Sequence, residues 1–262
     1  MQPFNFHTHT VRCGHAVGSD EEYVLKAIEA NMNTLGFSDH VPYRQSVLHK
    51  ERMPYELKDD YLISVAQLKK KYEDKIQIFL GYEAEYFDEH LDELIERYNE
   101  VDYMILGQHN LSLDGIDLGR SATDEQVLAY ASLIEKACAT GLFTYLAHPD
   151  YFMLARNDFS EACVQASHRI IAAVKKAGMA LECNMNGSRY GKKEVQGLGY
   201  VYAYPLRSFW EIVGDSDVLV IAGYDAHTPQ TLLQSERYEE VATILEGINL
   251  NWIKDVSQLI LR

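Results

Sequence analysis

Short apolar segments alternate with amphipathic segments along almost the whole chain, and this alternation restricts the fold more than any other feature. Two amphipathic segments begin with the spacing of a helix capping box, Ser19 with Glu22 and Thr123 with Gln126. Parallel strands need helical crossovers between them, so the alternation predicts an α/β fold with a parallel sheet. The apolar segments have the length and pattern of buried strands, and they are Pro3–His7, Thr34–Ser38, Ile76–Glu83, Tyr103–Gln108, Thr144–Ala147, Ala180–Asn184 and Val218–Gly223.

A single domain covering 1–262 fits this pattern, because no linker or low-complexity segment divides the 262 residues. Seven strand–helix units favour a sheet that closes into a barrel, with an open doubly wound sheet as the alternative. Irregular stretches at about 40–56, 110–122, 149–159 and 185–202 follow strand ends, where α/β proteins place their sites. These stretches are the expected walls of a site.

The composition excludes several classes of protein. No segment approaches the roughly 20 apolar residues of a membrane helix, and the N-terminus MQPFNFHTHT does not resemble a signal peptide, which predicts a cytoplasmic protein. The four cysteines form no CxxC pair, so we expect buried, reduced thiols. A formal charge of −15 disfavours nucleic acid as a partner.

The positions of the histidines carry the functional information. Seven of the ten lie at or just beyond the end of a predicted strand, and in a parallel barrel all strand ends of this kind meet at one mouth. Two carboxylates lie at strand ends in the same way: Glu83 ends the third predicted strand, and Asp225 follows the seventh together with His227. The seven histidines are His7, His9, His15, His40, His109, His148 and His227.

Nine imidazole and carboxylate side chains at one rim indicate a metal centre. The pair in HTH, His7 and His9, points to one side of an extended strand, but such a pair alone is weak evidence. The joint pattern is stronger, because so many poorly paired polar groups would be costly without an ion. This ligand chemistry suits Zn²⁺, Mn²⁺ or Fe²⁺. Three divalent ions could be held if Glu83 bridges two, leaving a local charge of about +4 that would attract a phosphate.

The motifs resemble those of the polymerase-and-histidinol-phosphatase (PHP) family, and within it the histidinol-phosphatase branch. The resemblance implies a distorted (β/α)₇ barrel with three metals: one held by His7, His9, Glu83 and Asp225, a second by His15, His40 and His227, and a third by Glu83, His109 and His148. The motifs that carry it are HTHTVRCGH at 7–15, FSDH at 37–40, GYEAEY at 81–86, GQH at 107–109, AHPD at 147–150 and YDAH at 224–227.

The resemblance implies hydrolysis of L-histidinol phosphate to L-histidinol and inorganic phosphate, a step of histidine biosynthesis, with a metal-bound hydroxide as nucleophile. We expect a small-molecule phosphate ester as the partner, and neither nucleic acid nor a membrane. The alternative within the family is a phosphoesterase for another small phosphomonoester or a nucleotide. Three further hypotheses are a metal-dependent amidohydrolase, a phosphodiesterase or nuclease, and a metal-binding module without catalysis.

Catalysis and substrate binding involve further residues beside the ligands. Glu83 and Asp225 are expected to be essential for catalysis, and Asp39 could be a general acid or could orient His40. Arginine suits phosphate because its planar fork pairs with two oxygens. We therefore expect Arg156 and Arg189, in the loops after the fifth and sixth strands, to bind the substrate phosphate. Acidic residues such as Glu85 or Asp150 could bind a cationic amino alcohol.

Overall fold

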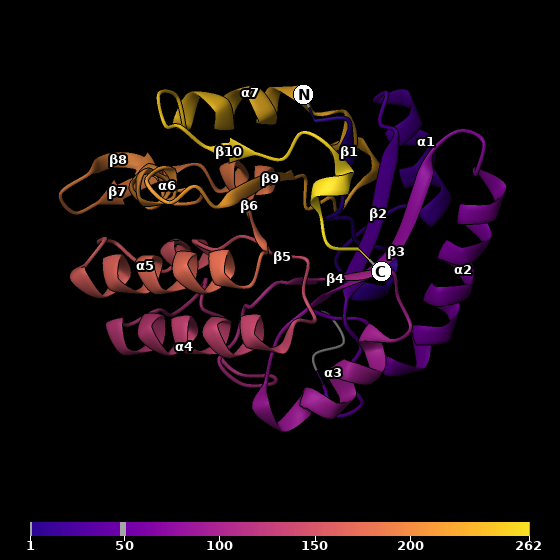
Figure 1. Ribbon diagram of the computed structural model, residues 1–262, viewed down its shortest axis with the longest axis horizontal. Helices are drawn as coiled ribbons and strands as arrows, with labels where there is room; N and C mark the ends of the chain where they lie inside the picture. The colour runs from indigo at the N-terminus through magenta and orange to yellow at the C-terminus, as the bar shows by residue number, and fades with distance from the viewer. Residues whose placement is uncertain (1, 48–50, 262) are drawn as a thin grey trace.

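A curled sheet of eight parallel strands forms the centre of the structure, a computed structural model that describes residues 2–47 and 51–261 (Figure 1). The strands lie in the order β1-β2-β3-β4-β5-β6-β9-β10. Their bounds are β1 Phe4–Asn5, β2 Thr34–His40, β3 Gln77–Ala84, β4 Tyr103–Leu106, β5 Tyr145–Leu146, β6 Ala180–Asn184, β9 Leu219–Gly223 and β10 Asn251–Trp252. All seven strands expected from the sequence are present, in a single α/β domain.

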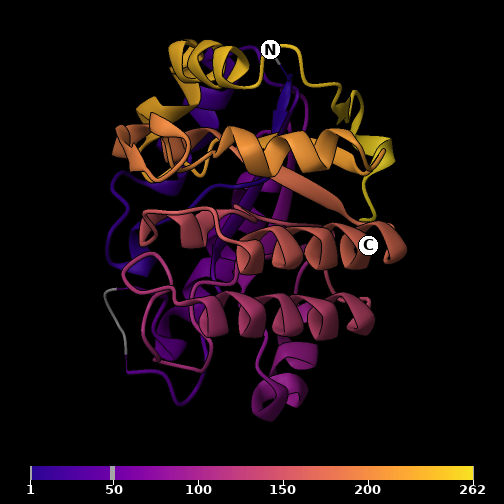
Figure 2. The same ribbon diagram turned by 90° about the vertical axis from the view of Figure 1, so that its left-hand side faces the viewer.

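Helices cover the outer face of this sheet. Figure 2 shows α4, α5 and α6 stacked in front of the strands. The capping boxes predicted at Ser19 and Thr123 are confirmed at the starts of α1 and α4, and Gly141 ends α4 in the left-handed conformation. The helices are α1 Asp20–Glu29, α2 Lys58–Lys71, α3 Leu91–Tyr98, α4 Asp124–Thr140, α5 Glu161–Lys176, α6 Arg207–Gly214 and α7 Ser235–Ile244.

Two hydrophobic cores lie on the two faces of the sheet. The larger one fills the space between the strands and the helices, and all four cysteines lie buried as free thiols. The smaller one lies inside the curl, where alternate strand residues such as Phe4, Phe6, Tyr103 and Ile105 pack together. This apolar floor supports the polar side chains at the carboxyl ends of the same strands.

The segments that follow β1 and β9 are joined at the carboxyl rim of the curled sheet. The His9 N–H donates to the carbonyl of Ala226 at 2.9 Å, and the Ala226 N–H donates to the carbonyl of His7 at 3.0 Å. These bonds join the segment after β1 to the segment after β9. His7, His9 and Asp225 are thereby brought to the same place from opposite ends of the chain.

The structure adds elements that the hydrophobic pattern does not predict. Strand β10 has only two residues, too few for any periodicity, and pairs in parallel with β9. The expected irregular stretch 185–202 contains an antiparallel hairpin, β7 Lys192–Val195 and β8 Gly199–Tyr202. The stretch 40–56 lies partly outside the described residues, at 48–50. Of the helices in the described part of the chain, none combines the length and apolar character that a membrane span requires.

Candidate metal centre

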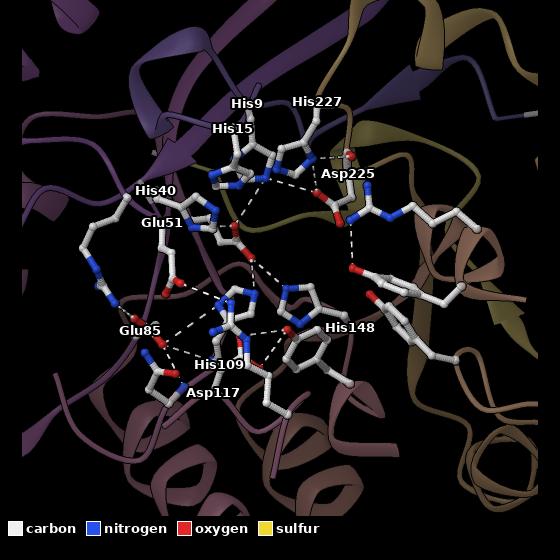
Figure 3. Close-up of a pocket in the computed structure, with 18 residues that line it drawn as sticks. His9, His15, His40, Glu51, Glu85, His109, Asp117, His148, Asp225 and His227 are labelled. Atoms are coloured by element: carbon white, nitrogen blue, oxygen red, sulfur yellow. Dashed lines mark hydrogen bonds and ion pairs between the residues drawn. The ribbon is translucent and has the colours of Figure 1, made fainter. Parts of the chain in front are cut away.

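A polar cavity opens at the carboxyl ends of the strands (Figure 3). In Figure 3 the rings of His9, His15, His40 and His227 gather on one side, and His109 and His148 lie opposite them. His7 lies fully buried next to this cavity, with its ring centroid 5.1 Å from that of His9. The residues that line the cavity are His9, His15, His40, Glu51, Arg52, Glu83, Glu85, His109, Asn110, Asp117, Arg120, His148, Tyr151, Arg189, Tyr190, Tyr204, Asp225 and His227.

Four ligand atoms, from β3 and from the segments that follow β1 and β9, are separated by distances typical of ligands around one metal ion. Nε2 of His7 lies 3.4 Å from Oε2 of Glu83 and 3.6 Å from Oδ1 of Asp225. Nε2 of His9 lies 3.4 Å and 3.1 Å from the same two oxygens. Donors bound at about 2.1 Å to one tetrahedral ion are about 3.4 Å apart. The four side chains therefore fit a single divalent ion.

The lack of protein partners for these atoms supports the same conclusion. Among the described residues, Nε2 of His7, both ring nitrogens of His9 and Oε2 of Glu83 are buried without a hydrogen-bond partner. Buried polar atoms are normally paired, because leaving them unpaired costs the desolvation energy without a return. In the described part of the chain these atoms thus lack hydrogen-bond partners at the point where a metal ion would bind them.

Further ligand atoms surround the other side of Glu83. His15, His40 and His227 each offer an atom within 4.8 Å of the others'. Oε2 of Glu83 lies 3.1 Å from Nδ1 of His40, whereas Oε1 lies 2.7 Å from Nε2 of His148. The two oxygens of one carboxylate thus face imidazoles on different sides, as a bridging ligand requires.

Electrostatics keep the carboxylates in the form that binds cations. Burial disfavours ionisation of Glu83 and Asp225, but neighbouring imidazoles outweigh it and hold the pKa of both carboxyls well below their ordinary values. Burial also acts to lower the pKa of His7, but the carboxylates around it, Glu182 foremost, raise that pKa to about 10. A divalent ion must therefore displace a proton from His7, which makes metal affinity fall as the pH is lowered.

Two of the ligand residues have strained backbones. His148 has φ of 33° and Asp225 has φ of 47°, both in the left-handed region that non-glycine residues rarely occupy. Strain of this kind persists where the surrounding structure imposes it, and it clusters at functional sites. The conformations turn both side chains into the cavity at the ends of β5 and β9.

Comparison with known proteins agrees with this geometry. The PHP domain family model matches residues 5–186. The chain belongs to the PHP domain family. A Deinococcus radiodurans protein named as a probable histidinol-phosphatase is 28% identical over 232 residues, which cover 85% of each chain. Asp225 and His227 lie outside the matched range, although the structure brings them to the same centre.

Two solved structures share the fold. A Listeria monocytogenes protein named as a candidate histidinol phosphatase aligns over 90% of this chain and 99% of its own, with TM-score 0.73 and 22% identity. Histidinol phosphate phosphatase from Lactococcus lactis, solved with zinc, L-histidinol and phosphate, aligns over 95% of both chains with TM-score 0.73 and 14% identity. A metal-dependent phosphatase is the class of enzyme that this family membership supports.

The sixth strand supports the PHP metal centre without contributing a predicted ligand. Oε1 of Glu182 accepts the Nδ1 proton of His7 at 2.8 Å, which leaves Nε2 of His7 available to an ion. Oε2 of Glu182 accepts the backbone N–H of His148 at 3.2 Å and the amide of Asn184 at 3.0 Å. The pattern of histidines at strand ends does not identify Glu182, although a carboxylate within the apolar segment 180–184 is a signal that the sequence contains.

We expect Glu182→Gln to weaken metal binding by about tenfold, the lower end for loss of a partner that orients a ligand histidine. The amide of glutamine has one NH₂ group where the carboxylate had a second oxygen. If this group faces the N–H donors of His148 and Asn184, two donors oppose each other. If it faces Nδ1 of His7, the ring proton must move to Nε2, the atom that would bind the ion. Chelator competition on the folded protein measures the change. Glu93→Gln, which alters a buried carboxylate of α3 outside the cavity, is the matched control. Equal metal affinity in both variants would contradict this role.

Three other predicted site residues lie near the centre, and two of them line the cavity. Asp39 is fully buried and does not line the cavity; its Oδ2 accepts from the Thr10 hydroxyl and its Oδ1 lies 3.6 Å from Nδ1 of His9. Glu85 lines the cavity, but its Oε2 pairs with Arg52 at 2.6 Å. Arg189 lines the cavity and donates to the Tyr190 hydroxyl at 2.8 Å.

The structure does not bring Arg156 and Asp150 to the cavity. The Arg156 guanidinium lies 2.7 Å from Oδ1 of Asp124 and 2.8 Å from Oδ1 of Asp158, and so braces the start of α4. Asp150 is buried and accepts the backbone N–H of Leu206 at 2.7 Å, and burial raises its pKa to about 7. Both residues lie in the loop that follows β5, but these contacts hold their side chains away from the cavity, so the expectation that they reach the substrate is wrong.

Proposed function

We propose that this protein hydrolyses L-histidinol phosphate to L-histidinol and inorganic phosphate in the cytoplasm. The unpartnered, converging atoms of His7, His9 and Glu83 carry the metal-dependent part of this proposal. The choice of histidinol phosphate is supported by the name of the Deinococcus radiodurans relative, which matches most of the chain. A phosphatase of the same family for another small phosphomonoester is the alternative.

The proposed centre holds three divalent ions, of zinc, manganese or iron. His7, His9, Glu83 and Asp225 would hold the first. The second would lie among His15, His40 and His227, and the third between Glu83, His109 and His148. At the third, Nε2 of His148 lies 2.7 Å and Nε2 of His109 lies 3.9 Å from Oε1 of Glu83. Bound ions of this kind lower the pKa of a coordinated water and stabilise the charge that develops on phosphate.

The chain's own residues would position the phosphate ester against this centre. Arg189 lies in the cavity wall with its guanidinium over the Tyr190 ring at 4.8 Å, and its N–H groups would pair with phosphate oxygens. Asp39 would act as a positioning residue for His9 in this proposal. Its complete burial and its bond from Thr10 favour that role over proton transfer to a substrate in the cavity.

The opposite wall of the cavity suits a positively charged organic group. Glu85 lines this wall, but Arg52 already neutralises it. The Asp117 carboxylate accepts from the Tyr151 hydroxyl at 3.0 Å and the Gly119 N–H at 2.6 Å, which are both neutral donors. We therefore place the ammonium group of the amino alcohol nearer to Asp117 than to Glu85.

Steady-state hydrolysis of a small panel of phosphomonoesters tests the proposal. With protein loaded separately with Zn²⁺, Mn²⁺ and Fe²⁺, we expect kcat/KM for L-histidinol phosphate of at least about 10⁴ M⁻¹s⁻¹, an ordinary value for a cognate substrate. Chelated protein, restored by adding the metal back, is the control. If the loaded protein cleaves another phosphomonoester but leaves histidinol phosphate intact, the substrate assignment is wrong. Metal analysis of the same samples counts the ions per chain.

A further inference from the structure

Tyr204 has an unused hydrogen-bond donor in the wall of the cavity. It follows the β7–β8 hairpin and precedes α6, and its side chain is 3% exposed. Among the described residues its hydroxyl has no hydrogen-bond partner. The other two tyrosines of the wall differ, because Tyr151 donates to Asp117 and Tyr190 accepts from Arg189.

The position of Tyr204 relative to the metal ligands is well defined. Its ring centroid lies 6.5 Å from that of the ligand candidate His148, 5.9 Å from Tyr151 and 6.4 Å from Tyr190. Behind the ring, Gly187 approaches so closely that a Cβ there would lie 2.7 Å from Cδ1 of Tyr204. The ring is therefore packed between the end of β6 and the cavity, and its orientation is fixed before a substrate binds.

The surroundings of the hydroxyl favour the protonated phenol. A tyrosine has an ordinary pKa of about 10, and burial raises the pKa of Tyr204 well above that value, with the Asp225 carboxylate adding to the effect. A neutral O–H group can donate to an anion. Among the described residues two more buried tyrosine hydroxyls, those of Tyr82 and Tyr145, are unpartnered, but neither residue lines the cavity.

We propose that the Tyr204 hydroxyl donates a hydrogen bond to an oxygen of the phosphate group of the bound substrate. A phosphate dianion between the metal ligands and Arg189 would supply the acceptor that the protein does not provide. The same bond would form with inorganic phosphate, the product. This inference rests on the proposed phosphatase function, but it concerns the phosphate group and not the organic half of the substrate.

Phosphate binding to Tyr204→Phe tests the inference directly. We expect inorganic phosphate, titrated calorimetrically into the metal-loaded full-length protein, to bind about tenfold more weakly than to the wild type, as for loss of a hydrogen bond to a charged group. The Ki of phosphate as a product inhibitor should rise by the same factor. Metal content and the melting temperature of the variant should not fall, since phenylalanine fills the same space.

Tyr82→Phe is the matched control, because it removes an equally buried and unpartnered hydroxyl that does not line the cavity. Phosphate affinity unchanged in Tyr204→Phe, or lowered to the same extent in Tyr82→Phe, would overturn the inference. The outcome is separable from the substrate assignment. If histidinol phosphate is not hydrolysed but phosphate binding weakens only in Tyr204→Phe, the role of Tyr204 stands and the proposed substrate fails.

Discussion

Glu83→Gln is expected to lower kcat/KM for L-histidinol phosphate by about a thousandfold or more, since metal-based charge stabilisation is worth several kcal/mol and about 1.4 kcal/mol is a factor of ten. Both oxygens of this carboxylate face imidazoles, Oε2 toward His7, His9 and His40 and Oε1 toward His148. The amide loses the negative charge and places an N–H₂ group where one ligand atom is needed. More than one ion should be affected.

Elemental analysis and steady-state kinetics on the same metal-loaded preparation check this prediction. Glu93→Gln is again the control, because Glu93 is a buried carboxylate that accepts the Arg44 N–H at 2.9 Å and lies outside the cavity. The control should retain its metal and its activity. A Glu83→Gln protein with the wild-type number of ions and undiminished turnover would show that Glu83 is not a shared ligand.

The convergence of the candidate ligands could be predicted from the sequence because their positions depend on one simple regularity. Each expected ligand ends or follows a strand, and a parallel sheet gathers those ends at one rim whatever the details of packing. Seven of the eight strands of the sheet were predictable for a different reason: they are largely buried and read as apolar runs, whereas the two-residue β10 does not. His227 and His7 are far apart in sequence, yet hydrogen bonds between the segments after β1 and β9 bring them together.

Other residues of the site depend on contacts that no local pattern encodes. Tyr204 reaches the cavity only because the chain returns to it after the β7–β8 hairpin, which a stretch of Gly, Lys and Tyr did not predict. Arg156 is the opposite case, because it was predicted to reach the cavity and does not. Its place in a loop after β5 suggested the rim, but acidic groups of α4 and its own loop, Asp124 and Asp158, hold the guanidinium elsewhere. Side-chain direction in a loop is decided by such local competition.

The glycines next to the centre are visible in the sequence, but their role depends on contacts that only the structure shows. Gly107 is part of the motif GQH in the sequence. The reason why this position needs glycine is steric, and it becomes evident only when β3 and β4 lie side by side in the structure. A Cβ at Gly107 would overlap Oε1 and Cγ of Glu83, and a Cβ at Gly223 would overlap Oε1 of Glu182. Both inward-facing carboxylates therefore occupy space that the neighbouring strand leaves open.

Gly107→Ala should consequently displace Glu83 and lower kcat/KM by about a hundredfold, the usual cost of moving a reacting group by roughly 1 Å. The backbone at Gly107 needs no left-handed conformation, so the methyl group itself causes the effect. Metal analysis should show fewer ions per chain, because the displaced carboxylate can no longer face His148 and His40 together. Gly214→Ala is the control: its methyl group would meet the Ile248 side chain outside the cavity and should affect thermal stability alone. Should Gly107→Ala keep both its ions and its activity, the packing of Glu83 against β4 is not what fixes the bridging carboxylate.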